Sequence, residues 1–378
     1  MTALFRRLFT QVQPIQPGIY HYQSPPQDPR NYKLHLRVEE DGSGVMIVNA
    51  TTVLHLNQTA TEYAYSFIQN QPADQVAQQM ARRYHVEPAK AEEDYHNLAE
   101  RILTLIEVPD LDPVTFLDFE RKTPYARKIS APYRLDCAIT YTLRQGADSS
   151  VAPVKRVDRE LTTEEWKSVL DKAWKVGIPH VIFTGGEPTL REDLPALIAR
   201  AESNGQVSGL LTDGLRLAEE VYLNQLLQTG LDHLMIVFQA DQETWWQALN
   251  KALAADIFVA VHLTLTPANA ADLPAYLGEL ARRGVLAVSL SVQDTALNAN
   301  LQSLRDQAAS LGLSLIWDLP VPYSTQNPVT LEVSGEGVVE GAGRAWLYVE
   351  PDGDVLPAQG INQVLGNFLK DPWEKIWK

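Results

Sequence analysis

The chain has 378 residues, of which 45% are hydrophobic and 21% charged, and its formal net charge is -15 with a pI near 5.0. These proportions are typical of a globular protein with more than one hydrophobic core. The acidic balance argues against a nucleic-acid partner, because binding to phosphates depends on clustered Lys and Arg. No apolar run reaches the length of a membrane span, and residues 1–9 lack the hydrophobic stretch of a signal peptide. We therefore expect a cytoplasmic protein with no membrane partner.

The first third of the chain predicts a small α+β domain behind an N-terminal arm. Residues 1–31 are rich in Pro, Gln and Tyr without a sustained period, which is typical of an extended, partly mobile arm. Residues 32–107 then predict a winged-helix arrangement of three strands and three helices, whose acidic helices weaken a DNA-binding interpretation. The expected strands are 32–38, 45–48 and 51–56, and the expected helices are 59–68, 75–84 and 88–106.

The remainder of the chain predicts a parallel α/β domain. Residues 108–131 contain several prolines and are expected to be a linker. Over residues 132–320, apolar strands alternate with amphipathic helices, as in a parallel sheet that curls into a full or partial barrel. The expected strands are 135–140, 180–184, 208–212, 233–238, 258–265 and 285–292, and a weaker candidate is 313–319. The expected helices are 163–175, 193–203, 219–228, 242–254, 271–282 and 300–311.

Residues 321–378 form the last predicted segment. Residues 346–356 have the pattern of a hairpin with an Asp-Gly turn, and 372–377 predict a short final helix. This segment is expected to be an extension of the preceding domain.

One turn in the α/β part has the pattern of a ligand-facing loop. The apolar run that ends at Thr184 is followed by Gly185, Gly186 and Glu187. The glycines permit a close approach of the backbone to another group. Because ligands bind at the loops that follow the carboxyl ends of parallel strands, we expect Glu187 to face a ligand. Ordinary strand-to-helix loop chemistry remains an alternative explanation of so short a motif.

Several motifs together resemble those of a known enzyme family. With them the chain resembles a radical S-adenosylmethionine (radical SAM) protein of the SPASM type that is preceded by a PqqD-like peptide-recognition domain. The resemblance implies a partial (β/α)6 barrel, an iron–sulfur cluster, bound S-adenosylmethionine (SAM) and action on a ribosomally made peptide (a RiPP). The motifs are Phe183-Thr184-Gly185-Gly186-Glu187-Pro188-Thr189-Leu190, Leu211-Thr212-Asp213-Gly214, Tyr348-Val349-Glu350-Pro351-Asp352-Gly353-Asp354-Val355-Leu356-Pro357, Val48-Asn49-Ala50 and Leu56-Asn57-Gln58-Thr59-Ala60-Thr61-Glu62.

The cysteines that bind the cluster in that family are replaced by other residues in this chain. The family places three cysteines, spaced Cys-x3-Cys-x2-Cys, in the loop after the first barrel strand. Leu143, Ala147 and Ser150 occupy these positions, and the chain has a single cysteine, Cys137, inside the preceding strand. Leucine and alanine offer iron no ligand, and a serine alcohol is a poor substitute for a thiolate. Ala358 likewise stands where the C-terminal segment of the family has a cysteine.

These substitutions lead to a degenerate, cluster-free interpretation. We expect no bound metal, no iron–sulfur cluster and no other cofactor, with SAM retained only at low probability. Gly185, Gly186 and Glu187 would then be a vestigial SAM site, because the cluster iron that holds the methionyl group in the family is missing. The same turn could equally be retained because it shapes the barrel.

Two functions remain open on this evidence. The first is a pseudoenzyme, a peptide- or partner-binding scaffold in RiPP-type maturation that works beside a cysteine-complete radical SAM homologue. A leader-type peptide would add as a strand to Thr52-Val53-Leu54-His55-Leu56. The second is an enzyme that uses the barrel mouth for SAM-dependent or other non-radical chemistry, with Glu187 as acid or base. No catalytic partner of Glu187 is evident, and His262 is expected to belong to the core.

Overall fold

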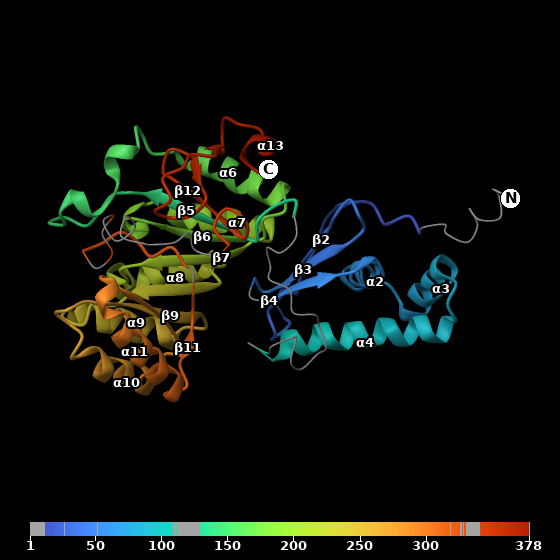
Figure 1. Ribbon diagram of the computed structural model, residues 1–378, viewed down its shortest axis with the longest axis horizontal. Helices are drawn as coiled ribbons and strands as arrows, with labels where there is room; N and C mark the ends of the chain where they lie inside the picture. The colour runs from blue at the N-terminus through green and yellow to red at the C-terminus, as the bar shows by residue number, and fades with distance from the viewer. Residues whose placement is uncertain are drawn as a thin grey trace. The chain divides into compact units, whose positions relative to one another are not determined.

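The computed structural model describes residues 12–25, 27–50, 52–108, 111, 129–317, 319–325, 327, 329 and 341–377. Figure 1 shows their helices and strands. They fall into two compact units, which divide between Ser130 and Ala131. None of the helices in these ranges is long and apolar enough to cross a bilayer.

The first unit contains a four-stranded antiparallel sheet in the order β1-β2-β3-β4. One of its strands was not expected from the sequence, since residues 18–23 fall in the predicted mobile arm. They pair with β2 from Gly18↔Val38 to Gln23↔Lys33, and Tyr20 and Tyr22 pack against the core of the unit. Burial of these two rings on one face stabilises the strand. The strands are β1 (Gly18–Gln23), β2 (Lys33–Val38), β3 (Gly44–Val48) and β4 (Thr52–Leu56).

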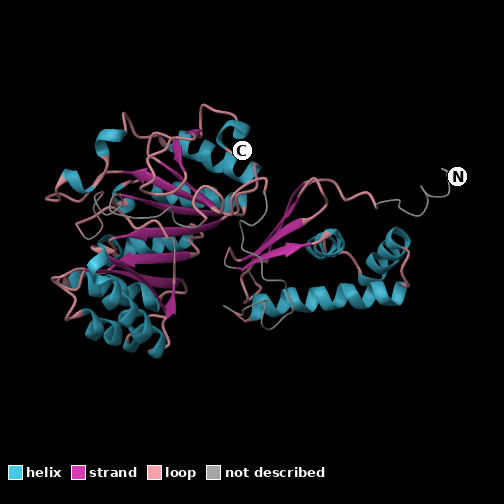
Figure 2. Cartoon of the chain, in the orientation of Figure 1, coloured by secondary structure: helices cyan, strands magenta, loops and turns pink. Residues whose placement is uncertain are grey.

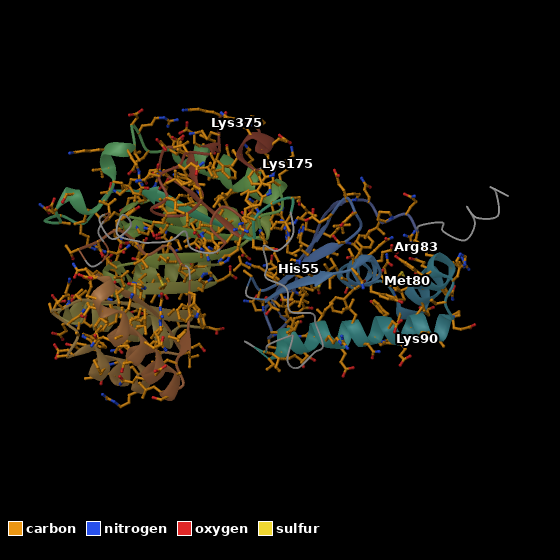
Figure 3. The ribbon with its side chains drawn as sticks, in the orientation of Figure 1. His55, Met80, Arg83, Lys90, Lys175 and Lys375 are labelled. Atoms are coloured by element: carbon orange, nitrogen blue, oxygen red, sulfur yellow. The ribbon has the colours of Figure 1, made fainter. Side chains whose placement is uncertain are left out.

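Three helices follow this sheet, as predicted. Asn57 caps the first of them, because its side chain accepts a hydrogen bond from the N–H of Ala60 at 2.9 Å. Within that helix the buried carboxylate of Glu62 pairs with Arg83 at 2.7 Å and accepts from the hydroxyl of Tyr84 at 2.8 Å. This pair ties the first helix to the second, on which Arg83 is labelled in Figure 3. The helices are α2 (Gln58–Ile68), α3 (Ala73–Tyr84) and α4 (Pro88–Glu107).

The second unit is built on one ten-stranded sheet in the order β11-β10-β9-β8-β7-β6-β5-β12-β13-β14. The strands from β11 through β12 are parallel, whereas β13 and β14 are antiparallel. Among the described strands none closes the sheet, and β11 and β14 form its edges. The strands are β5 (Arg134–Thr140), β6 (His180–Gly185), β7 (Val207–Thr212), β8 (His233–Val237), β9 (Phe258–Leu265), β10 (Ala287–Val292), β11 (Ser314–Leu315), β12 (Trp346–Val349), β13 (Asp354–Leu356) and β14 (Gly366–Asn367).

The long helices of this unit share a core with alternate residues of the strands. On β6, for example, Val181 and Phe183 belong to the core that contains the helices, whereas Ile182 faces the other side together with Met235 of β8. Helices on a single face are the arrangement of a barrel wall rather than of a doubly wound sheet. Figure 2 shows these helices beside the strands. They are α6 (Thr163–Lys175), α7 (Leu194–Asn204), α8 (Glu220–Gln228), α9 (Glu243–Ala254), α10 (Leu273–Arg282) and α11 (Asn298–Ser310), and a short α13 (Trp373–Ile376) follows later.

The prediction of an α/β protein with a mostly parallel sheet is therefore confirmed. Two details differ. The weak candidate strand at 313–319 is only the two-residue β11. The predicted hairpin is present, with Tyr348 opposite Leu356, but its first strand also joins the large sheet beside β5, with Trp346 opposite Arg134. All of β12 is buried, so it covers a strand that would otherwise be an exposed parallel edge.

Candidate functional site

The Gly-Gly turn lies directly against the end of β5. Gly185 has φ +130°, and a Cβ added there would lie 2.1 Å from the carbonyl oxygen of Thr140. A Cβ on Gly186 would lie 2.4 Å from the carbonyl oxygen of Thr142. The same two carbonyls accept hydrogen bonds from the N–H groups of Gly186, at 2.8 Å, and Glu187, at 2.9 Å. Both glycines are therefore needed for the contact between the ends of β5 and β6.

Glu187 is buried between the ends of β6 and β7, with 3% of its surface exposed. One carboxylate oxygen accepts from the N–H of Thr189 at 2.9 Å, from the hydroxyl of the same residue, and from the hydroxyl of Thr212 at 2.7 Å. The other accepts from the N–H of Asp213 at 2.7 Å. Burial, followed by the negative charge of Asp213, raises the pKa of Glu187 to about 7. The carboxylate that was expected to face a ligand is thus held by protein donors.

An ion pair that sequence reasoning missed lies next to Glu187. The guanidinium of Arg144 donates hydrogen bonds from Nε and Nη2 to the two carboxylate oxygens of Asp213, and the bond from Nη2 measures 2.9 Å. Asp213 also accepts from the N–H of Leu215 at 2.9 Å, which fixes the carboxylate on its loop. The side chains of Arg144 and Asp213 are 33% and 16% exposed. The sequence did hold a signal, because Asp213 stands where the family usually has asparagine.

The three positions of the family's cysteine motif do not form a cluster site from this chain's side chains. Leu143 packs against the buried group that contains Tyr141 and Tyr323, while Ala147 and Ser150 are exposed. Cys137 is fully buried in the core shared with the helices, and burial raises the pKa of its thiol well above the usual value. A neutral thiol in that core is not positioned as an iron ligand. The donor set therefore does not fit the three-thiolate site of the family.

Residues beyond the parallel strands contact the Gly-Gly turn and the loop that follows β5. The N–H of Tyr323 donates to the carbonyl of Gly185 at 2.7 Å, and the Tyr323 ring meets the Tyr141 ring edge-on at 5.5 Å between centroids. The Tyr141 hydroxyl donates to Glu350 at 2.8 Å, and Arg156 pairs with the same carboxylate at 2.7 Å. The C-terminal hairpin is thereby tied to the loop that follows β5.

His262 is a core residue, as expected. It is 1% exposed, and its ring nitrogens lie 3.1 Å from Ser289, 3.1 Å from Ser291 and 3.2 Å from Thr264. Burial lowers the pKa of His262 to about 4, so the imidazole is neutral at pH 7. These three hydroxyls satisfy the ring, and the histidine needs no ligand.

The predicted peptide-binding strand, β4, lies at the edge of the first sheet and, among the described strands, pairs with β3 alone. Leu54 and Leu56 are buried in a core that also contains Ile102 and Leu105 of α4. Residues 52, 53 and 55 are only half-buried. An edge strand leaves alternate N–H and C=O groups without a neighbouring strand, which is the geometry that strand addition requires.

Comparisons with known proteins agree with the fold of the second unit. Residues 137–267 match the model of the radical SAM superfamily. A PqqA peptide cyclase of Granulibacter bethesdensis is 38% identical over 91 residues, which are 24% of this chain and 24% of that protein. Streptococcus suis SuiB bound to S-adenosylmethionine has a similar structure, with a TM-score of 0.59 at 14% identity over 91% of this chain and 87% of SuiB. The structure of SuiB bound to precursor peptide SuiA has a TM-score of 0.59 at 14% identity, over 95% of this chain and 88% of SuiB.

These findings overturn the expectation that the chain takes no cofactor, with SAM retained only at low probability and an iron–sulfur cluster excluded. That prediction is wrong, because residues 137–267 match a superfamily defined by SAM and iron–sulfur chemistry. A protein with the same fold also has a structure with SAM bound. The prediction rested on three substituted positions in one loop, whereas the match extends over residues 137–267.

Proposed function

We propose that this chain is a catalytically degenerate radical SAM-like protein that acts as a peptide- or partner-binding scaffold in RiPP-type peptide maturation. In this proposal residues 32–107 are a PqqD-like peptide-recognition domain and residues 132–320 a radical SAM-like partial barrel. Strand β1, which falls within the expected arm of residues 1–31, belongs to the same sheet as residues 32–56. Most of the expected linker, residues 108–131, lies outside the described residues. Residues 321–378 are a SPASM-like extension. A leader-type peptide adds as a strand along β4, and a cysteine-complete radical SAM homologue is the second partner.

The observation that carries the proposal is the outer edge of β4, which no other described strand covers. Its buried leucines anchor the strand in the core of the first unit, so the outer edge can pair with a peptide without rearranging that core. Two relatives support the choice of ligand, since one is a PqqA peptide cyclase and another was determined with a precursor peptide bound. The substituted cysteine positions, Leu143, Ala147 and Ser150, support catalytic degeneracy.

Glu187 supports a second candidate function, an enzyme that works by non-radical acid–base chemistry. A carboxyl group with a pKa of about 7 can both donate and accept a proton at neutral pH. Against this candidate, Glu187 is 3% exposed and its oxygens accept four hydrogen bonds from protein donors. A general base must reach a substrate atom, so we rank this function second.

Proline variants of β4 test the scaffold proposal in the full-length protein. Neighbouring residues of an edge strand direct their N–H groups to opposite sides, so either Thr52→Pro or Val53→Pro removes a donor from the free edge. The variant that retains the native far-UV circular dichroism is expected to bind labelled precursor peptides about tenfold or more weakly in fluorescence anisotropy. The peptides are those encoded beside this protein's gene.

A control variant introduces proline at an exposed position elsewhere in the same unit. Gln16 lies ahead of β1, on a segment that is not part of the β4 edge, and Gln16→Pro should leave peptide affinity unchanged. The scaffold proposal is wrong if both folded β4 variants bind every peptide as the unmodified protein does. It also fails if none of the neighbouring peptides binds the unmodified protein.

A further inference from the structure

A pocket of about 730 Å³ lies in the first unit, and residues of the loop between β1 and β2 line it together with the last residue of α4. Hydrogen bonds within the loop hold its backbone. The N–H of Ser24 donates to the carbonyl of Tyr32 at 2.9 Å, and the N–H of Tyr32 donates to the hydroxyl of Ser24 at 2.9 Å. The N–H of Asp28 donates to the carbonyl of Pro25, also at 2.9 Å. The pocket therefore has a fixed rim.

The walls of this pocket are aromatic and apolar. The rings of Tyr22 and Tyr32 lie 5.7 Å apart between centroids, and both pack against the core of the unit. Tyr22 is only partly buried, and the exposed Pro25 and Pro29 complete the apolar lining. Such walls accept the methylene stem of a long side chain, and the face of a tyrosine ring attracts a cation.

The charged side chains that line the pocket do not balance one another. Arg30 donates two hydrogen bonds to Asp28, from Nε at 2.9 Å and from Nη2 at 2.7 Å, so these two charges compensate each other. Glu107 lies 3.9 Å from Nη1 of Arg30, which is too far for a hydrogen bond, and its side chain is 60% exposed. Among the described residues no cation donates a hydrogen bond to Glu107. The lining therefore carries one uncompensated negative charge.

We propose that this pocket binds the basic side chain of an arginine or lysine residue in a peptide. The methylene stem lies along Pro25, Pro29 and the ring of Tyr22, and the charged head pairs with Glu107. An anion meets repulsion from Glu107, and the nearby arginine is already engaged. The inference rests on the proposed function for the source of the side chain, which is the peptide held by the first unit.

The register of the sheet relates the pocket to the β4 edge. Tyr22 lies opposite Leu34, which in turn lies opposite Val48. Val48 lies opposite Thr52, so Tyr22 and Thr52 belong to one row across the sheet. A peptide strand outside β4 is four strand spacings from β1, about 19 Å in all, and an extended chain covers about 3.3–3.6 Å per residue. The basic residue is therefore expected about six residues or more beyond the paired segment, past the Thr52 end of β4.

Blocked amino acids test the pocket apart from any peptide. N-acetyl-L-arginine amide is titrated into the full-length protein, whose tyrosine rings carry a ¹³C label for NMR. The ring signal of Tyr22, assigned by its loss in Tyr22→Phe labelled only at tyrosine, is expected to shift and saturate with a Kd in the millimolar range. N-acetyl-L-norleucine amide has a similar stem without the charge and should bind at least about threefold more weakly. No saturable shift with the arginine compound, or equal affinity for the norleucine compound, overturns the proposal.

Substitutions of Glu107 identify the charge that matters. Glu107→Gln is expected to raise the Kd for N-acetyl-L-arginine amide about two- to fivefold, which is the effect of an exposed ion pair. Glu107→Lys reverses the charge and should raise the Kd more than about tenfold. Glu100→Gln is the control, because Glu100 is exposed on the same helix and does not line the pocket. An unchanged Kd in folded Glu107→Gln and Glu107→Lys proteins contradicts the assignment.

The readouts distinguish this inference from the peptide proposal. The folded β4 proline variants should bind N-acetyl-L-arginine amide with unchanged Kd, because that edge is not part of the pocket. A precursor peptide that loses its basic residue to norleucine should bind the unmodified protein more weakly, but should bind Glu107→Lys no worse than the original peptide does. Failure of the blocked amino acid to bind refutes the pocket alone, whereas failure of every precursor peptide to bind refutes the scaffold.

Discussion

Replacing Gly185 with alanine is expected to lower the free energy of unfolding by about 3 kcal/mol or more. At φ +130° an alanine is strained, and its Cβ would lie 2.1 Å from the carbonyl oxygen of Thr140. That oxygen belongs to the backbone and accepts the N–H of Gly186, so it cannot move aside cheaply. Urea unfolding followed by circular dichroism measures the loss, or poor recovery of folded protein reveals it.

Gly278 provides the matched control for this substitution. It lies inside α10, and a Cβ added there would meet no atom within 4 Å. Gly278→Ala is therefore expected to stabilise the protein by about 0.5–1 kcal/mol, because alanine loses less backbone freedom in a helix. Equal stability of the Gly185→Ala and Gly278→Ala proteins would show that the turn is not packed as described.

Glu187→Gln is expected to remove a pH dependence of stability. In the folded protein the pKa of Glu187 is about 7, against a usual value of 4.5. Between these two values the folded state binds more protons than the unfolded state, so stability from this group falls as pH rises. The wild-type free energy of unfolding, relative to that of Glu187→Gln, should decline by about 3 kcal/mol from pH 4.5 to pH 7.

The measurement is urea unfolding of both proteins at several pH values across that window. Glu165→Gln is the control, because hydrogen bonding and pairing with Arg159 lower the pKa of Glu165 to about 2. The Glu165 carboxylate is ionised in both the folded and the unfolded state above about pH 5. The difference in free energy of unfolding between wild type and Glu165→Gln should therefore not change with pH in that range. A flat difference for Glu187→Gln as well would mean that the pKa of Glu187 is not raised.

Much of the fold could be predicted from the sequence because its signals are local. The period of apolar residues placed the strands and helices of the parallel sheet, and turn residues marked the hairpin over 346–356. Asn57 and Thr162 mark helix starts that the structure caps with their side chains. Strand β1 was missed because its stretch of sequence is rich in Pro and Gln and has no local strand pattern. It is stabilised by pairing with β2 and by the packing of Tyr20 and Tyr22 against the core.

Some features of the candidate site are likewise determined by the sequence, whereas others depend on the tertiary structure. By itself the sequence determined the Gly-Gly-Glu turn, the single cysteine and the replacement of the family's cysteines by Leu143, Ala147 and Ser150, because identity and spacing are properties of the chain alone. Only the tertiary structure decided that Arg144 pairs with Asp213, 69 positions away, and that Glu187 is buried among donors from two loops. The parallel strands β5, β6 and β7 bring such distant loop ends to one end of the sheet, and burial then raises the pKa of Glu187.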